Sequence, residues 1–156
     1  MSIDPSWPVL GRTDNATFYL ADPQVIVVAP DEGCTDDETT ARQSIGFQQS
    51  YWKTHGRRGA AVVLMDRVNH QTRDARRVYQ EEVDSTLVTA FGLVSGTVFG
   101  NAVGSVFLGL ARPAIPTCMF GDVAAALQWV RSHHEALARS EPDAHAAADP
   151  TEVDVA

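Results

Sequence analysis

The sequence predicts a single α/β domain in which an N-terminal β-hairpin precedes alternating helices and strands. The sheet is expected to be mixed and mostly parallel, with helices packed on it. Two continuous apolar runs, at residues 60–65 and 87–94, are typical of strands that helices cover on both faces. Segments with helical periodicity alternate with such runs, which is typical of βαβ units. The 156 residues suffice for one domain of ordinary size.

The hairpin is predicted from two short runs near the N-terminus. Residues 17–21 and 25–29 are rich in β-branched and aromatic side chains, and Asp22-Pro23-Gln24 between them has turn chemistry. Residues 1–16 are polar and contain proline. They are therefore expected to form a loose lead-in to the domain.

The first helix is predicted to begin at a capping box, in which Thr35 and Glu38 each bond the backbone amide of the other. Gly56 is expected to end it. The later elements follow from apolar runs, turn residues and helix caps. They are a strand at 60–65, a helix from about 71 to 83, a strand at 87–94, a glycine-rich helix at 96–110, a strand at 117–120 and a last helix after Gly121-Asp122. The domain is thus expected to span 17–138, with a disordered acidic tail at 139–156.

The charge balance argues against nucleic acid as a partner. The chain has 12 Lys and Arg residues against 20 Asp and Glu, a net charge of −8, whereas phosphate binding needs clustered cations. The two cysteines, Cys34 and Cys118, lack metal-site spacing and are expected to be reduced thiols of a cytoplasmic protein. The start of the chain has neither the basic residues nor the apolar core of a signal peptide.

An uncharged run from residue 85 to 111 is long enough to span a bilayer. It carries several hydroxyl side chains and five glycines, however, and its flanks give a poor orientation signal. A buried strand followed by a buried helix in a water-soluble domain fits these features better. No membrane span is therefore expected.

The common catalytic motifs are missing from the sequence. It has no Gly-x-Ser-x-Gly elbow, no phosphate loop ending in Gly-Lys-Ser/Thr and no His-Glu-x-x-His. Asp66 and His70 follow a predicted parallel strand, at the edge of the sheet where ligands bind. A solvated loop pair is the simpler interpretation, because no nucleophile is placed beside them. We therefore expect no enzyme, no catalytic residue, no metal site and no cofactor.

Thr72 is placed where a helix is predicted to begin. Its hydroxyl is a plausible N-cap, and the same group is a candidate for regulatory phosphorylation, because a helix N-terminus receives a phosphate well. Further along, Gly96, Gly100 and Gly104 recur every four residues. This stripe of glycines is compatible with close packing of a helix on the sheet, and also with packing against a second copy in a homodimer.

Three segments carry a resemblance to a known family. The stretches GNAVGSVFLGLARP and RPAIPTCMFGDVAAALQWV, together with VVLMD before a helix, are similar to STAS-like proteins of the SpoIIAA-like, STAS/Sec14 type. The resemblance covers residues 17 to 138. It implies a regulatory domain that binds a protein partner, such as a kinase-like regulator.

The family's phosphorylated turn, Asp-Ser-Ser-Gly, does not occur here, and Thr72 is the nearest hydroxyl by position. The absence of that turn favours a role in binding alone, without a phosphorylation switch. The candidates for partner binding surround the strand end and the stripe of glycines: Asp66, Asn69, His70, Arg73, Gly96, Gly100, Asn101 and Gly104. The alternative is a carrier of a small apolar ligand or lipid in a cavity beside the glycine-rich helix.

Overall fold

The structure of the chain is a computed structural model that describes residues 3–96 and 115–140. Its elements in chain order are β1 (Val9–Arg12), β2 (Ala16–Asp22), β3 (Val25–Pro30), β4 (Cys34–Asp36), α1 (Glu38–Thr54), β5 (Gly59–Leu64), a 3-10 turn at Met65–Arg67, β6 (Val68–Gln71), α2 (Arg73–Glu81), β7 (Val88–Val94), β8 (Thr117–Phe120) and α4 (Val123–Ser140).

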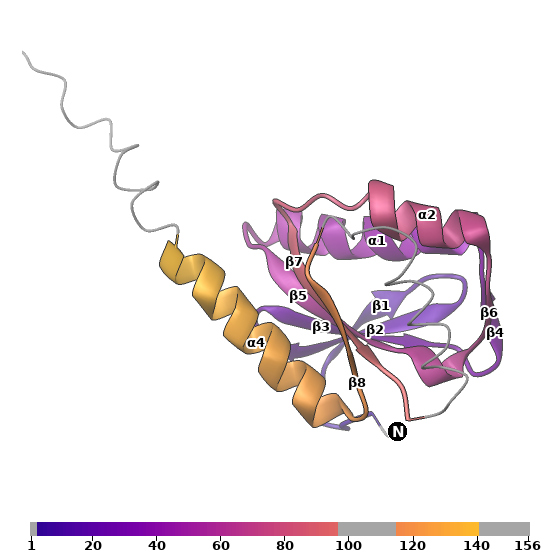
Figure 1. Ribbon diagram of the computed structural model, residues 1–156, viewed down its shortest axis with the longest axis horizontal. Helices are drawn as coiled ribbons and strands as arrows, with labels where there is room; N and C mark the ends of the chain where they lie inside the picture. The colour runs from indigo at the N-terminus through magenta and orange to yellow at the C-terminus, as the bar shows by residue number, and fades with distance from the viewer. Residues whose placement is uncertain (1–2, 97–114, 141–156) are drawn as a thin grey trace, which may run out of the picture.

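A mixed sheet with the order β1-β2-β3-β5-β7-β8 runs through the centre of the described part of the chain (Figure 1). The pairs β1–β2 and β2–β3 are antiparallel, whereas β3–β5, β5–β7 and β7–β8 are parallel. A smaller parallel sheet joins β4 to β6. The predicted fold class is confirmed, with the hairpin at β2–β3 and alternating helices and strands after it.

Helices cover both faces of the large sheet. Helices α1 and α2 lie on one face and α4 lies on the other (Figure 1). Alternate residues of a strand point to opposite faces, so Ala61 of β5 packs in the cluster under α1 and α2, while Val62 and Leu64 pack under α4. Every residue of β3 and β7 is buried. Two-sided coverage therefore explains the continuous apolar runs of the central strands.

The predicted loose lead-in is wrong for part of its length. Residues 9–12 form β1, which pairs with β2, and β2 itself begins at Ala16. β1 is a short edge strand of four residues, none of them buried, so its sequence has no apolar run to announce it. Val9 on this strand is 62% exposed. Among the described residues it is the one large hydrophobic side chain that is mainly exposed to solvent.

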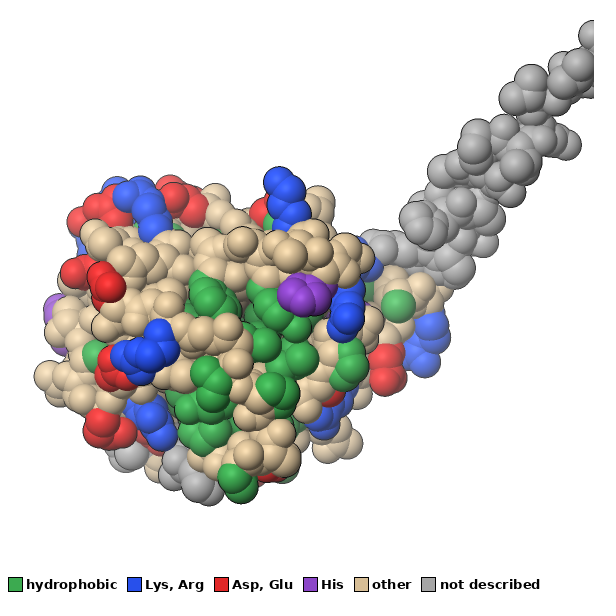
Figure 2. All heavy atoms as spheres, turned by 180° about the vertical axis from the view of Figure 1, so that it is seen from behind, with side chains coloured by type: hydrophobic (Ala, Val, Ile, Leu, Met, Phe, Trp, Pro, Cys, Tyr) green, Lys and Arg blue, Asp and Glu red, His purple; other side chains and the backbone are tan. Residues whose placement is uncertain are grey.

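Hydrophobic side chains gather in the middle of one face of the molecule, seen from behind in Figure 2, with charged groups around them. Strands β1 and β2 and helix α1 also carry hydrophobic side chains that are only partly buried against the core. They are Leu10, Leu20, Phe47 and Tyr51. The fold thus leaves some apolar area of these elements open to solvent.

The start of α1 differs from its prediction. Asp37, not Thr35, is the N-cap: its carboxylate accepts a hydrogen bond from the amide of Thr40 at 2.9 Å, and the Thr40 hydroxyl accepts one from the amide of Asp37 at 2.8 Å. Thr35 belongs to β4, which pairs with β6. Because residues 34–36 are engaged in that small sheet, the helix begins after them. Its end is as expected, with Gly56 at a φ of 61°.

Several predictions fall outside the described residues. They concern most of the glycine-rich helix at 96–110, with Gly100, Asn101 and Gly104, and the tail from residue 141 onward; residues 139 and 140 end α4. Of the long uncharged run, residues 88–94 form the buried strand β7. Within 3–96 and 115–140, no helix has both the length and the hydropathy for crossing a membrane.

Candidate functional site

Asp66 ties together the ends of two parallel strands. It lies in the 3-10 turn after β5, and its carboxylate accepts hydrogen bonds from the Ser95 hydroxyl at 2.6 Å and the Gly96 amide at 2.8 Å, just beyond β7. The structure thus brings Asp66 and Gly96 together at the C-terminal edge of the sheet. Ligands of parallel sheets bind at this edge. His70 instead lies exposed on β6, where Thr35 of β4 is its neighbour.

Thr72 is the N-cap of α2, as predicted. Its hydroxyl accepts a hydrogen bond from the amide of Ala75 at 3.1 Å, which satisfies a donor that the first turn leaves free. Its own amide donates to the backbone oxygen of Asp36 at 2.9 Å. The start of α2 is therefore anchored to β4. Phosphorylation of Thr72 stays a prediction.

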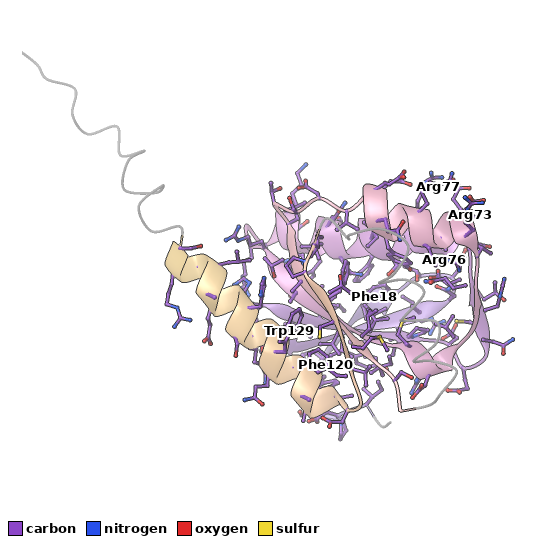
Figure 3. The ribbon with its side chains drawn as sticks, in the orientation of Figure 1. Phe18, Arg73, Arg76, Arg77, Phe120 and Trp129 are labelled. Carbon is purple, nitrogen blue, oxygen red and sulfur yellow. The ribbon has the colours of Figure 1, made fainter. Side chains whose placement is uncertain are left out.

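Three of the predicted binding residues are exposed beside this cap. Asn69 and His70 lie on β6, and Arg73 is the first residue of α2. Arg73 and Arg77 lie on the outer side of α2 (Figure 3). Arg77 pairs with Asp74 at 3.3 Å, whereas Arg73 has no ion pair within the described part of the chain. We call Asn69, His70, Thr72 and Arg73 the α2 cap surface.

Behind the α2 cap surface lies a buried polar network that the sequence analysis missed. Its centre is the carboxylate of Asp36, whose residue is 6% exposed. The carboxylate accepts hydrogen bonds from the Thr40 hydroxyl at 2.8 Å, the Gln71 amide at 3.0 Å and the Tyr79 hydroxyl at 2.9 Å. The network thus joins β4, α1, β6 and α2. The partners of Asp36 lie 4 to 43 residues away in the sequence, so the spacing of residues does not reveal the network.

The network continues along α1 to Gln48. The Gln48 amide nitrogen donates to the Ser44 hydroxyl at 3.3 Å, and Ser44 is in turn hydrogen-bonded to the Tyr79 hydroxyl. Burial, followed by the negative charge of Asp36, raises the pKa of Tyr79 well above its usual range. Tyr79 therefore remains protonated and donates to Asp36. Gln48 lies at helical spacing from the buried Ile45 and Trp52 of α1, and a glutamine at that position is the sequence signal that could have pointed to this network.

A cavity of about 50 Å³ adjoins the network. Its polar lining comes from Asn15, Asp36, Ser44, Gln48, Gln71 and Tyr79. Its apolar wall includes side chains from β5 and β7, namely Val63, Phe91 and Leu93. The side-chain oxygens of Gln48 and Gln71 are buried and have no hydrogen-bond partner. The cavity thus has acceptor groups at one side and hydrocarbon at the other.

Cys34 lies next to this region but is poorly suited to nucleophilic chemistry. Partial burial raises the pKa of its thiol, and the nearby carboxylates of Asp36, Asp31 and Glu32 raise it further. The thiolate is the reactive form, so this surrounding suppresses reactivity. Both cysteines are free thiols. Within 3–96 and 115–140, no group of three His, Cys, Asp or Glu residues is arranged to hold a metal ion.

The fold and the site define a small α/β domain with a mixed sheet, a capped helix beside exposed polar residues, and a buried polar network. The chain belongs to the family described as a domain of unknown function, DUF7793, which matches residues 41–134. The matched part runs from α1 into α4 and contains the α2 cap surface. Comparison with curated proteins finds no match. Comparison with solved structures finds none either.

Proposed function

We propose that the chain is a cytoplasmic, non-enzymatic interaction domain of STAS-like type, which binds a protein partner such as a kinase-like regulator through its α2 cap surface. The resemblance of its later segments to STAS-like proteins supports this proposal. The order of the elements supports it as well, because a hairpin followed by βαβ units, with a capped helix after the buried strand β5, is similar to the layout of STAS-type domains.

The observation that carries the proposal is the contrast between the α2 cap surface and its base. Asn69, His70 and Arg73 are exposed, and Arg73 has no ion pair in the described part of the chain. The base beneath them is fixed by the hydrogen bond from Thr72 to Asp36 and by the buried network. A fixed backbone beneath exposed polar side chains suits recognition, because little backbone entropy is lost on binding. Asp66, another predicted binding residue, is engaged instead in hydrogen bonds that join the turn after β5 to Ser95 and Gly96 at the end of β7.

The proposal is tested by affinity capture from the source cell with charge-matched variants. Arg73→Glu is expected to weaken capture of the specific partner about tenfold or more, because it reverses the charge at the surface. The matched control is Lys53→Glu, which makes the same charge change at the exposed end of α1 and should leave capture unchanged. A partner set that is the same for both variants would contradict the proposal.

Thr72 tests the regulatory part of the proposal. Thr72→Glu places a negative charge at the cap and is expected to release the partner, whereas Thr72→Ala is expected to retain it. Circular dichroism of both variants establishes that each is folded. Equal binding by the two variants would rule out a phosphorylation switch at Thr72 and leave binding alone.

A second candidate function is a carrier of a small ligand, and the cavity beside α1 and α2 favours it. At about 50 Å³ the cavity has room for a few non-hydrogen atoms, since one water-sized position takes roughly 10–15 Å³. As lined by the described residues, the cavity is therefore too small to enclose a lipid chain. A short ligand is the version of this candidate that the cavity supports.

A further inference from the structure

We propose that the cavity between α1, α2 and the sheet binds the protonated amino group of a short primary amine, with the Asp36 carboxylate as its counter-charge. The inference rests on the second candidate function, the ligand carrier, and names the chemistry of its ligand. It does not depend on the partner that binds the α2 cap surface.

The hydrogen bonds of the network leave two buried acceptors unused. The Gln71 amide nitrogen is held by Asp36, and the Gln48 amide nitrogen is held by Ser44. These bonds fix both side-chain amides so that their oxygens are left over, and both oxygens are buried without a partner. A buried acceptor without a donor is costly. Both glutamines line the cavity, so a group with several N–H donors placed there is the kind of partner that their oxygens lack.

The charge of the site points in the same direction. A carboxylate has about four acceptor positions, and the three protein donors to Asp36 leave room for one more. Among the described residues no ion pair joins Asp36 to a cation; Arg76 donates instead to the backbone oxygen of Gln71 at 2.8 Å. Buried charges are ordinarily paired. A cationic donor in the cavity would provide that pairing.

The opposite wall and the size of the cavity set the rest of the ligand. Val63, Phe91 and Leu93 offer hydrocarbon and no side-chain hydrogen bond. Water molecules filling the whole space, or a hydrated metal ion, would lack partners on that side. A short alkyl group would fill it with favourable contacts. The volume of about 50 Å³ corresponds to roughly three or four water-sized positions, which suits methylammonium or ethylammonium.

The experiment titrates the full chain at neutral pH, where an aliphatic amine is protonated, and follows the protein by NMR. The probes are ethylammonium, ethanol as its neutral counterpart of similar size, and potassium ion at matched ionic strength. Ethylammonium is expected to bind saturably and at least about tenfold more tightly than ethanol or potassium. Its ethyl protons should show nuclear Overhauser contacts to Phe91 and Leu93.

Three variants locate the site. Asp36→Asn removes the charge with little change of shape and should weaken ethylammonium binding about tenfold or more while leaving ethanol binding nearly unchanged. Glu32→Gln removes the same charge from an exposed position, a side chain 80% exposed, and should change neither. Val63→Phe fills the cavity without altering any charge, so it should abolish binding even if Asp36→Asn proves too unstable to measure.

The outcomes separate the inference from the carrier function. If ethanol binds as tightly as ethylammonium, and Asp36→Asn binds both equally, the cavity carries neutral ligands and the amine inference is overturned. Stronger binding of potassium would overturn it in favour of a metal ion. If none of the probes binds saturably, both the inference and the carrier candidate fail.

Discussion

Gly46 and Gly59 differ in what surrounds the point where a side chain would begin. A Cβ atom on Gly59 of β5 would lie 2.5 Å from the backbone oxygen of Gln24 and 2.3 Å from the ring of Trp52. A Cβ atom on Gly46 of α1 would meet nothing within 4 Å. One glycine is thus required by close packing, whereas the other occupies a helix position at which alanine has higher helix propensity.

The two glycines give a matched prediction at the residue scale. Gly59→Ala is expected to lower the free energy of unfolding by about 1–3 kcal/mol, because backbone has to move to admit the methyl group. Gly46→Ala is expected to raise it by roughly 0.5–1 kcal/mol, because alanine loses less backbone entropy in a helix. Urea unfolding at one pH measures both. A neutral effect at Gly59 would show that the contact with Trp52 relaxes easily.

At the scale of elements, α2 is a short helix whose start depends on one side chain. Nine residues form it, and the Thr72 hydroxyl caps its first turn. Helices this short are marginal without tertiary contacts, so capping and the burial of Ala75 and Val78 have to hold it together. The cap therefore affects the stability of the first turn of α2, whereas the backbone bond from Thr72 to Asp36 does not depend on the hydroxyl.

Removing the cap is expected to loosen α2 without unfolding the domain. Thr72→Ala should cost about 1 kcal/mol of stability, whereas Thr72→Ser, which keeps the hydroxyl, should cost a few tenths. Amide hydrogen exchange of Ala75 and its neighbours measures the local effect. Protection of these amides that is unchanged in Thr72→Ala would show that packing alone holds the first turn.

The same scale shows how far the sequence could predict the structure. The long buried strands β3, β5 and β7 and the amphipathic helices were predicted, because burial on two faces leaves a continuous apolar run and burial on one face leaves a periodic pattern. The short strands β1, β4 and β6 were not, since they lack the run of apolar residues by which β8, an equally short strand, was predicted. Thr72 was found through local capping chemistry. The Asp36 network was not, because its contacts to Gln71 and Tyr79 span 35 and 43 residues.

At the scale of the whole molecule, α4 covers one face of the sheet and buries a histidine against it. His134 is 6% exposed, and its ring lies 3.5 Å from the Thr89 hydroxyl of β7. Burial lowers the pKa of His134, and repulsion by Arg58 lowers it further, while Asp22 and Glu135 act in the opposite direction. The folded domain therefore favours the neutral ring.

The lowered pKa of His134 sets the sign of a pH dependence. The unfolded chain takes up the proton near the ordinary histidine value of about 6.5, whereas the folded chain takes it up only at lower pH. The contribution of neutral His134 to stability is thus complete above that value and is lost as the pH falls below it. Urea unfolding should give a smaller free energy at pH 5.5 than at pH 7.5, and His134→Gln should reduce this difference.

The control for that measurement is His70→Gln, which alters an exposed histidine on β6. It is expected to keep the pH dependence of the unaltered chain. If both histidine variants change the pH dependence to the same extent, the protonation of His134 is not its source.

The position of β3 determines how the chain can be shortened. β3 hydrogen-bonds with β2 on one side and β5 on the other, and so it lies inside the sheet although it precedes the family match at residues 41–134. A fragment limited to 41–134 would turn β5 into an open edge with a row of unpaired backbone groups, an arrangement that invites association between chains. It would also lack Asp36. The family match thus delimits a stretch of sequence that is smaller than the folding unit.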